Sequence, residues 1–482
     1  MPSSIELNIG HAPSPRRQRS DDDGDVAPFR VVVLGDFSGR PSAERGPLAQ
    51  RRAVRVDIDN FETVFARMAP LAEIAGLQDK LGVTLRIKLE TMEEFSADAV
   101  LARLPPQALA HAAALVPASA APAPTHVDDA EDPAALMHRL LGGSLPANAP
   151  ALAAAAPSAA RPDATIDRLI RQLVGTQEAA PAPAAPSHGS DEAAAALLRH
   201  VLRDPAWRHL ECAWRAVDRF VRELDMADGD VRLELLDCRA DELLADLAAA
   251  AGDPARAAIT PALKGDGRGC DLVVSLEEFG PGLAELSLLG GLAAAASAQG
   301  AVLLAGAAPA LAAVATSEDA QVLASNEARV WRALRESALA PHLGLTFPRL
   351  LARLPYGPRN DPVAAFPFDE LADAPAGAPH DHLLWRSAAL DAALLLAQGH
   401  GQGGVETLVQ MDDLPAFIDR TGDEPRLQAV AEVYLGEREA GIVQGAGFVT
   451  LQSDRRVPNA RVSGWRSIAA GGNADLRGSW RG

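Results

Sequence analysis

The sequence predicts an α/β protein built from two α/β regions that flank a linker. Short apolar runs rich in β-branched residues indicate buried strands, and in the second half they alternate with helical patterns. Between the halves, alanine, proline and serine dominate, with too little large apolar surface to offset the entropy of ordering the backbone. We expect a disordered N-terminus over residues 1–28, a first α/β domain over 29–115, a disordered linker with short helices over 116–190, a second α/β core over 191–400 and a C-terminal part over 401–482.

Two strands define the first region. Residues 29–34 (FRVVVL) form a β-branched run that Gly35 and Asp36 close, which indicates a buried strand ending in a loop. Residues 83–90 alternate between apolar and polar side chains, which predicts a half-buried strand. Asp36 stands where α/β proteins place their sites, although a lone carboxylate in a turn more often caps a backbone N–H.

A helix separates these two strands. Its apolar residues are spaced three, one and three apart over residues 61–68; Asp59 and Asn60 precede it as capping residues, and Pro70 ends it. A second helix is predicted to start near Ser96.

Two short amphipathic segments interrupt the linker, over residues 134–141 and 166–174. Each has the length of a helix that is stable only when it docks on another surface. That surface is either a partner protein or this protein's own body, and the residues alone leave both open.

The second region opens with the clearest helical period in the chain. Its apolar residues step by three and four along one seam, which predicts a helix packed into the core, with Trp207 and Trp214 as packing residues. Further on, residues 231–236 alternate as a strand, and the apolar strands 270–275 and 301–305 flank a helical stretch. This order predicts a parallel, right-handed βαβ crossover.

Composition excludes several classes of partner. The chain has 45 Lys+Arg and 64 Asp+Glu, a net charge of −19, which repels nucleic-acid phosphates and anionic membrane surfaces. The first twenty residues contain no apolar signal segment, and the most apolar stretch, over residues 283–315, is interrupted by polar residues, glycine and proline. Three cysteines match neither a zinc knuckle nor a disulfide framework. We expect a reduced, cytoplasmic protein with no membrane insertion.

A search for catalytic motifs finds little. His380 with His382, and His209 with Cys212, each supply two ligands where a zinc site needs three or four. No glycine-rich stretch has the form of a phosphate-binding loop, and there is no nucleophile elbow. We therefore expect no catalytic, metal or cofactor site, with Asp36 as the best remaining candidate for chemistry.

The segment over residues 345–357 (LTFPRLLARLPYG) suggests a structural role. It combines prolines and Gly357 as rigid turn markers with Arg349 and Arg353 four residues apart and the rare Tyr356. A rigid backbone that presents guanidinium groups suits a fixed ion-pair contact, buried or between subunits, or the binding of an anionic ligand.

Several sequence blocks, in order, resemble the contractile sheath of bacterial type VI secretion systems, with both sheath subunits in one chain. The blocks that resemble the small subunit, TssB (VipA), are VVVLGDFSGR from Val31, PLAQRRAVRVDIDNF from Pro47 and LETMEEFSADAV from Leu89. The blocks that resemble the large subunit, TssC (VipB), are DPAWRHLECAWRAVDRFV from Asp204, DLVVSLEEFG from Asp271, LGLTFPRLLARLPYG from Leu343, FPFDE from Phe366 and LLWRSAAL from Leu383.

The resemblance implies a non-enzymatic protein that polymerises with itself or other sheath subunits around an inner tube (Hcp-like), on a baseplate, and contracts to expel the tube. It also implies disassembly by a ClpV-type AAA+ ATPase that engages a helix near the start of the large subunit. Candidate positions for that helix are Leu136, Leu140, Ile166, Leu169 and Ile170. We expect structural or interface roles for Asp36, Arg51, Asp59, Asn60, Trp207, Trp214, Arg349, Arg353, Tyr356 and Gly357.

The family's large subunit continues past the element matched here by Gly447 and Phe448, and its small subunit has a helical C-terminal portion. On this comparison we expect both regions to be shortened at elements that link subunits. Two alternatives therefore stand beside the polymerising sheath subunit. One is a sheath homologue that does not polymerise and instead caps or regulates assembly, and the other is an α/β enzyme that uses Asp36 on an anionic substrate.

Overall fold

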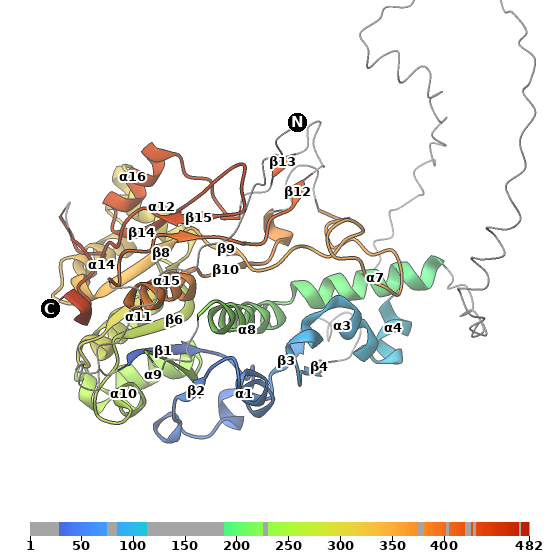
Figure 1. The fold of residues 1–482 in the computed structure, drawn as a ribbon, viewed down its shortest axis with the longest axis horizontal. Helices are drawn as coiled ribbons and strands as arrows, with labels where there is room; N and C mark the ends of the chain where they lie inside the picture. The colour runs from blue at the N-terminus through green and yellow to red at the C-terminus, as the bar shows by residue number, and fades with distance from the viewer. Residues whose placement is uncertain are drawn as a thin grey trace, which may run out of the picture.

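A mixed sheet flanked by helices on both faces forms the centre of the computed structural model of this chain (Figure 1). It has nine strands in the order β11-β15-β14-β8-β7-β6-β1-β5-β2. The strands from β5 to β14 in this order run parallel, while β2, β15 and β11 each pair antiparallel with a neighbour. The structure describes residues 28–74, 84–112, 188–224, 230–374, 380–401, 404–419, 426–427, 430–471 and 474–481.

The first region supplies two strands of this sheet and a small separate hairpin. Its helix α1 begins and ends where the spacing predicted, and Ser96 caps α3 by accepting a hydrogen bond from Ala99 N. The elements are β1 (Phe29–Gly35), β2 (Val54–Val56), α1 (Phe61–Met68), β3 (Leu71–Ile74), β4 (Leu85–Lys88), α3 (Ala97–Arg103) and α4 (Pro106–His111). Strand β4 alternates between buried and exposed residues, as predicted.

The second region supplies the remaining strands of the sheet and the larger helices. Strands β6 and β7 pair in parallel on either side of α11 in sequence, as the βαβ pattern predicted. The helices are α7 (His188–Arg203), α8 (Pro205–Glu223), α9 (Ala240–Ala249), α10 (Thr260–Lys264), α11 (Leu283–Ser297), α12 (Pro309–Thr316), α13 (Ala320–Leu323), α14 (Asn326–Arg335), α15 (Ala389–Gly401) and α16 (Glu437–Gly445). The strands are β5 (Val231–Asp237), β6 (Leu272–Phe279), β7 (Val302–Ala307), β8 (Leu343–Phe347), β9 (Leu350–Leu351), β10 (Trp385–Arg386), β11 (Gln410–Met411), β12 (Ile418–Asp419), β13 (Arg426–Leu427), β14 (Phe448–Ser453) and β15 (Ala460–Val462).

The α/β class is confirmed, and the two regions share one sheet. Strand β1 of the first region lies between β5 and β6 of the second and pairs in parallel with both. Val31 and Val33 pack into the core that contains the α8 tryptophans, whereas Val32 and Leu34 pack into the core on the other face, with α9 and α11. Because both faces of β1 are covered, the strand is buried along its whole length.

Helix α8 joins the first region to the sheet through its aromatic residues. Trp207 and Trp214 are both fully buried. The Trp214 ring lies 4.6 Å from that of Phe65 and 5.5 Å from that of Phe37, and its Nε1 donates to the Phe37 carbonyl at 2.9 Å. The Trp207 ring lies 5.3 Å from that of Phe95. The seam predicted from the sequence is therefore the surface on which the first region packs.

The segment expected to be the linker, including both short amphipathic helices, lies outside the described residues except where α7 begins at His188. Helix α4 contacts α7, so the chain leaves the first region and enters the second on neighbouring helices (Figure 1).

We predict that the two regions associate without a covalent link. When residues 1–150 and 151–482 are produced as separate chains, they should co-purify, because β1 hydrogen-bonds to strands on both of its sides. A Val31→Asp variant of the first chain should not be captured, since it places a charge at a position with no solvent exposure. Separate elution of the two unmodified chains on size-exclusion chromatography would contradict the prediction.

Candidate functional site

A tight turn follows β1 and holds Asp36. Asp36 is 8% exposed, and its Oδ1 accepts a hydrogen bond from Gly39 N at 2.7 Å. Gly39 has φ +63°, and a Cβ at this position would lie 2.2 Å from the Leu71 carbonyl oxygen, so the turn requires glycine. Asp36 also pairs with Arg45 and, at 3.5 Å, with Arg239. It therefore caps a backbone N–H of the turn, the arrangement in which a lone carboxylate at a turn is more often found.

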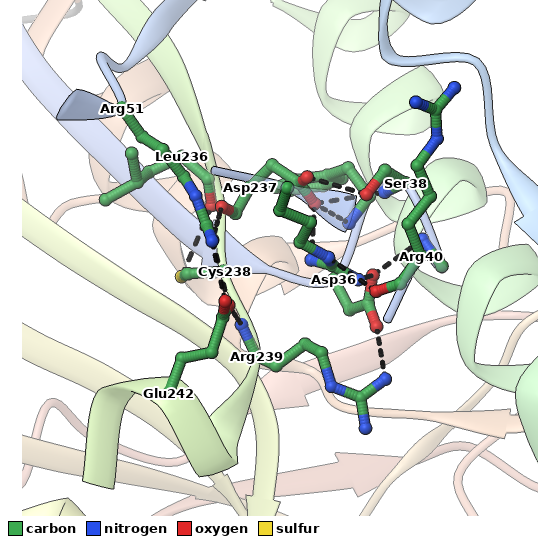
Figure 2. A network of polar contacts seen from close by, with 12 residues as sticks. Asp36, Ser38, Arg40, Arg51, Leu236, Asp237, Cys238, Arg239 and Glu242 are labelled. Atoms are coloured by element: carbon green, nitrogen blue, oxygen red, sulfur yellow. Dashed lines mark hydrogen bonds and ion pairs between the residues drawn. The ribbon is translucent and has the colours of Figure 1, made fainter. Parts of the chain in front are cut away.

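Asp237 at the end of β5 fixes this turn from the neighbouring strand. Its Oδ1 accepts hydrogen bonds from Phe37 N at 2.9 Å and Ser38 N at 3.0 Å, and its Oδ2 accepts one from the Ser38 hydroxyl at 2.7 Å (Figure 2). Arg45 lies between Asp237 and Asp36 and pairs with both. We call the cluster of Asp36, Arg45 and Asp237, together with the Arg51–Glu242 pair described below, the turn centre.

Arg51 links the same loop to the start of α9. Its guanidinium forms a bidentate pair with Glu242, at 2.8 and 2.6 Å, and donates to the carbonyls of Asp237 and Gly46 (Figure 2). The hydrogen bond to Glu242 raises the pKa of Arg51. Burial opposes ionisation of Glu242, but hydrogen bonds from Arg51 and from Arg239 N outweigh it and lower the pKa of Glu242. Arg51 and Glu242 therefore both stay charged in the turn centre.

Arg30, on β1, makes a second set of contacts with the other region. It is 5% exposed and pairs with Glu234 of β5 at 2.6 Å. Its Nη1 also donates to the carbonyls of Leu263 and Gly269, at 2.5 and 2.8 Å, so it holds the glycine-rich loop before β6. Arg30 was not identified from the sequence, because a single charged residue in an apolar strand does not indicate which distant residue it will pair with.

Arg353 is the hub of a second buried cluster, which we call the arginine centre. Its side chain is 7% exposed, and it donates to Glu211 of α8 at 2.7 Å and to Glu370 at 2.7 and 3.0 Å. Glu211 is fully buried and also accepts from Trp207 Nε1 and Arg215 Nε. The sequence analysis did not identify Glu211, although its position four residues after Trp207 puts it on the same face of the helix.

Electrostatics keep the arginine centre charged. Burial would raise the pKa of Glu211, but the charges of Arg353 and Arg215 outweigh it, so the pKa is lowered. Burial likewise opposes the charge on Arg353, yet Glu211 and Glu370 raise its pKa well above the ordinary value. The guanidinium also lies 4.3 Å from the centre of the Tyr356 ring. The pKa of Tyr356 rises to about 12, mainly because its phenol is buried.

Arg349 makes a neighbouring ion pair in a more exposed position. It forms a bidentate contact with Glu432, at 2.6 and 2.5 Å, and a single contact with Glu278 at 3.1 Å. The Arg349 side chain is 25% exposed, whereas that of Glu432 is 2% exposed. His380 Nε2 also lies 3.0 Å from Glu432. The two arginines of the motif are therefore each held by carboxylates of this chain.

The remaining predicted residues occupy varied positions. Tyr356 donates its hydroxyl hydrogen to the carbonyl of Phe95 in the first region at 3.2 Å, and Gly357 N donates to the Asp361 carbonyl at 3.0 Å. Asp59 is exposed in the turn before α1. Asn60 occupies the N-cap position of α1, but the expected capping bond is not made, because the Asn60 side chain instead accepts from Asp57 N. The candidate ATPase-docking residues Leu136, Leu140, Ile166, Leu169 and Ile170 lie outside the described residues.

The two histidine spacings do not build a metal centre in the part of the chain that the structure describes, where no group of three or more metal-ligating side chains comes together. Cys212 donates to the carbonyl of Trp385, and burial raises the pKa of its thiol to about 12. Asp36 does not lie with Arg349 or Arg353, since its partners are Arg45 and Arg239. None of the described helices is both long and apolar enough to cross a bilayer.

The contacts between the two regions have a structural role. The turn centre fastens loops of the first region to β5 and α9 of the second, and Tyr356, beside the arginine centre, donates to the Phe95 carbonyl of the first region. Residues 190–469 match the family VipB, EvpB-type tail sheath N-terminal domain, and residues 20–112 match the type VI secretion system family VipA. The chain belongs to the VipB tail sheath family, and it carries a VipA region before the VipB region in the manner of a TssB–TssC fusion.

Two relatives from Pseudomonas aeruginosa agree with both matches. The chain is 25% identical to the type VI secretion system sheath protein TssC1 over 299 residues, which cover 57% of this chain and 58% of that protein. It is 30% identical to the sheath protein TssB1 over 76 residues, which cover 15% of this chain and 44% of that protein. The chain therefore spans about half the length of each relative that it matches.

We predict that Arg353→Ala destabilises the fold by about 3–5 kcal/mol, because it leaves Glu211 and Glu370 buried without their cation. Arg349→Ala should cost less, about 1–3 kcal/mol, since Arg349 is partly exposed. Urea denaturation of each variant measures the loss. Exposed Arg461→Ala serves as the control, and equal midpoints for all three variants would refute the role of the arginine centre.

A pH effect follows from Glu278. Burial raises the pKa of its carboxyl to about 7 from 4.5, and the nearby charge of Glu432 adds to the rise. The folded state thus binds a proton that the unfolded state has released between these pH values, so this group makes the free energy of unfolding fall as pH rises from 4.5 to about 7. Glu278→Gln should flatten this decline and stabilise the protein at pH 8 by about 1–3 kcal/mol.

Thermal or urea unfolding between pH 5 and pH 8 tests this effect, with the exposed Glu437→Gln as the matched control. A Glu278→Gln variant whose pH profile runs parallel to that of the unmodified protein would show that the carboxyl does not titrate in this range.

Proposed function

We propose that this chain is a fused sheath subunit that polymerises in the cytoplasm around an inner tube and contracts to expel it. The observation that carries the proposal is β1, which lies between β5 and β6, so that one chain already holds the small-subunit and large-subunit parts folded together. The two family matches support the same arrangement. On this proposal residues 29–115 are the small-subunit domain, 191–400 the large-subunit core and 401–482 its C-terminal part.

The sheet also offers positions where neighbouring copies can attach. Among the described residues, β2 at one edge and β11 at the other each pair with a single strand. An edge strand presents unpaired N–H and C=O groups to which a strand from another copy can add. Contacts that repeat from copy to copy without closing a ring build a helical polymer.

Contraction requires two lattice packings of different free energy and no active site. On this proposal the turn centre and the arginine centre keep each subunit rigid, so that a change of packing occurs between subunits rather than within one. The partners are other sheath subunits, an Hcp-like inner tube, a baseplate and a ClpV-type ATPase.

Electron microscopy of the purified chain mixed with its inner-tube protein tests polymerisation. We expect tubules whose wall repeats at the spacing of one fused chain. Particles that stay monomeric at all salt and protein concentrations would overturn the proposal and favour a sheath homologue that caps or regulates assembly.

The interaction with the ATPase is tested separately. Deleting residues 134–141 and 166–174 removes both candidate docking helices, so polymers should still form, but a ClpV-type ATPase with ATP should no longer disassemble the contracted form. Deletion of residues 146–162, which has the same total length, is the control. Disassembly at an unchanged rate, followed by light scattering, would place the docking site elsewhere.

A further inference from the structure

A cavity of about 270 Å³ lies between α8, the second half of β6 and β10. It lies outside both polar centres, and its Glu278 carboxylate contacts Arg349. Residues near the carboxyl ends of parallel strands are where α/β proteins place ligands. The side chains that line the cavity and matter below are Arg208, His209, Glu277, Glu278 and Arg386.

Arg208 is a cation without a carboxylate partner. Its guanidinium donates only to main-chain carbonyls, those of Asp381 at 3.1 Å and of Leu383. Across the described part of the chain, no carboxylate oxygen lies within ion-pair distance of it, whereas Arg349 and Arg353 each have two carboxylate partners. Burial lowers the pKa of Arg208, as expected for a guanidinium whose desolvation is not offset by a nearby anion.

Two side chains that line the cavity each have a polar atom without a hydrogen-bond partner among the described residues. The Arg386 side chain is 3% exposed, and both of its terminal nitrogens contact Asp391, which leaves its Nε–H unpaired. His209 Nε2 is buried and unpaired as well. Both atoms are closed to solvent, so a molecule in the cavity does not contact them directly.

The cavity also contains an anion whose charge is not matched at short range. Glu278 is paired with Arg349, but the one basic group within ion-pair distance of Glu277 in the described residues is His209, whose Nε2 is 3.9 Å away. One uncompensated cation and one uncompensated anion therefore line the same small space. A ligand of a single charge would satisfy one of them and be repelled by the other.

We propose that this cavity binds a free α-amino acid, with the ligand's carboxylate on Arg208 and its ammonium group on Glu277. A volume of about 270 Å³ is close to the lower limit of roughly 300 Å³ for drug-sized ligands and fits a molecule of amino-acid size. The planar guanidinium matches a carboxylate, and the Glu277 carboxylate matches an ammonium group. Every group named belongs to one chain, so binding can be tested on the unpolymerised protein.

Thermal unfolding of the full chain in the presence of each of the twenty common amino acids tests the proposal, with sodium chloride at the same ionic strength as the reference. At least one amino acid should raise the melting temperature by about 2 °C or more at saturation, because a ligand that binds only the folded state stabilises it. The carboxylic acid that lacks the amino group and the amine that lacks the carboxylate should each give a smaller rise.

Variants then locate the binding site. Arg208→Gln should weaken the affinity measured by calorimetry about tenfold or more, and Glu277→Gln should remove the preference for the amino acid over its deaminated analogue. The exposed Arg461→Gln should leave both unchanged. Glu277→Gln keeps the test decisive if Arg208→Gln fails to fold, since the Glu277 side chain is partly exposed and, among the described residues, its ion-pair contact is the long one to His209 at 3.9 Å. The proposal is overturned if no amino acid stabilises the unmodified chain beyond sodium chloride, or if the folded variants bind as tightly as it does.

Discussion

The insertion of β1 between β5 and β6 is the interaction on which the rest of the structure depends. Without β1, the facing edges of two buried strands would present main-chain N–H and C=O groups with no partner, at a cost that folded proteins avoid. Both cores would also lose a row of side chains, Val31 and Val33 on one face and Val32 and Leu34 on the other. Arg30 helps to fix the position of β1 between its neighbours, because its side chain contacts Glu234 of β5 on one side and the loop before β6 on the other.

The polar centres hold loop segments whose orientation apolar packing alone does not fix. The turn after β1 and the loop that contains Arg51 meet β5 through Asp237, and the segment after β8 meets α8 through Arg353 and Glu211. Burying these charges costs desolvation free energy, so such pairs contribute less to net stability than their number suggests. Their geometry requires every partner to be in place, which fixes how the loops of the first region meet β5 and how the segment after β8 meets α8.

The sequence predicted local elements well and long-range partners poorly. Residues 29–34 and the α8 seam were identified because period and side-chain type are local properties. Arg349 and Arg353 were recognised as fixed contacts from their rigid surroundings, but Glu432 and Glu370 were not, because nothing in the residues around a carboxylate tells which distant cation it meets. Asp237 was missed for the same reason, since a polar residue at the end of a strand is common and does not indicate a particular partner.

The sequence by itself thus determined the α/β class, the positions of β1 and of β4 to β7, the helices α1, α3, α8 and α11, and the likeness to the two sheath subunits, all of which rest on short-range patterns and ordered blocks. Only the tertiary structure decided that the two regions share one sheet and which carboxylates hold the arginines. The physical reason is that strands are joined by main-chain hydrogen bonds common to every residue, so the order of strands in a sheet is not written in the side chains of any one strand. The unmatched charges of Arg208 and Glu277 were likewise evident only from the tertiary structure, because a missing partner can be recognised only when all neighbours in space are known.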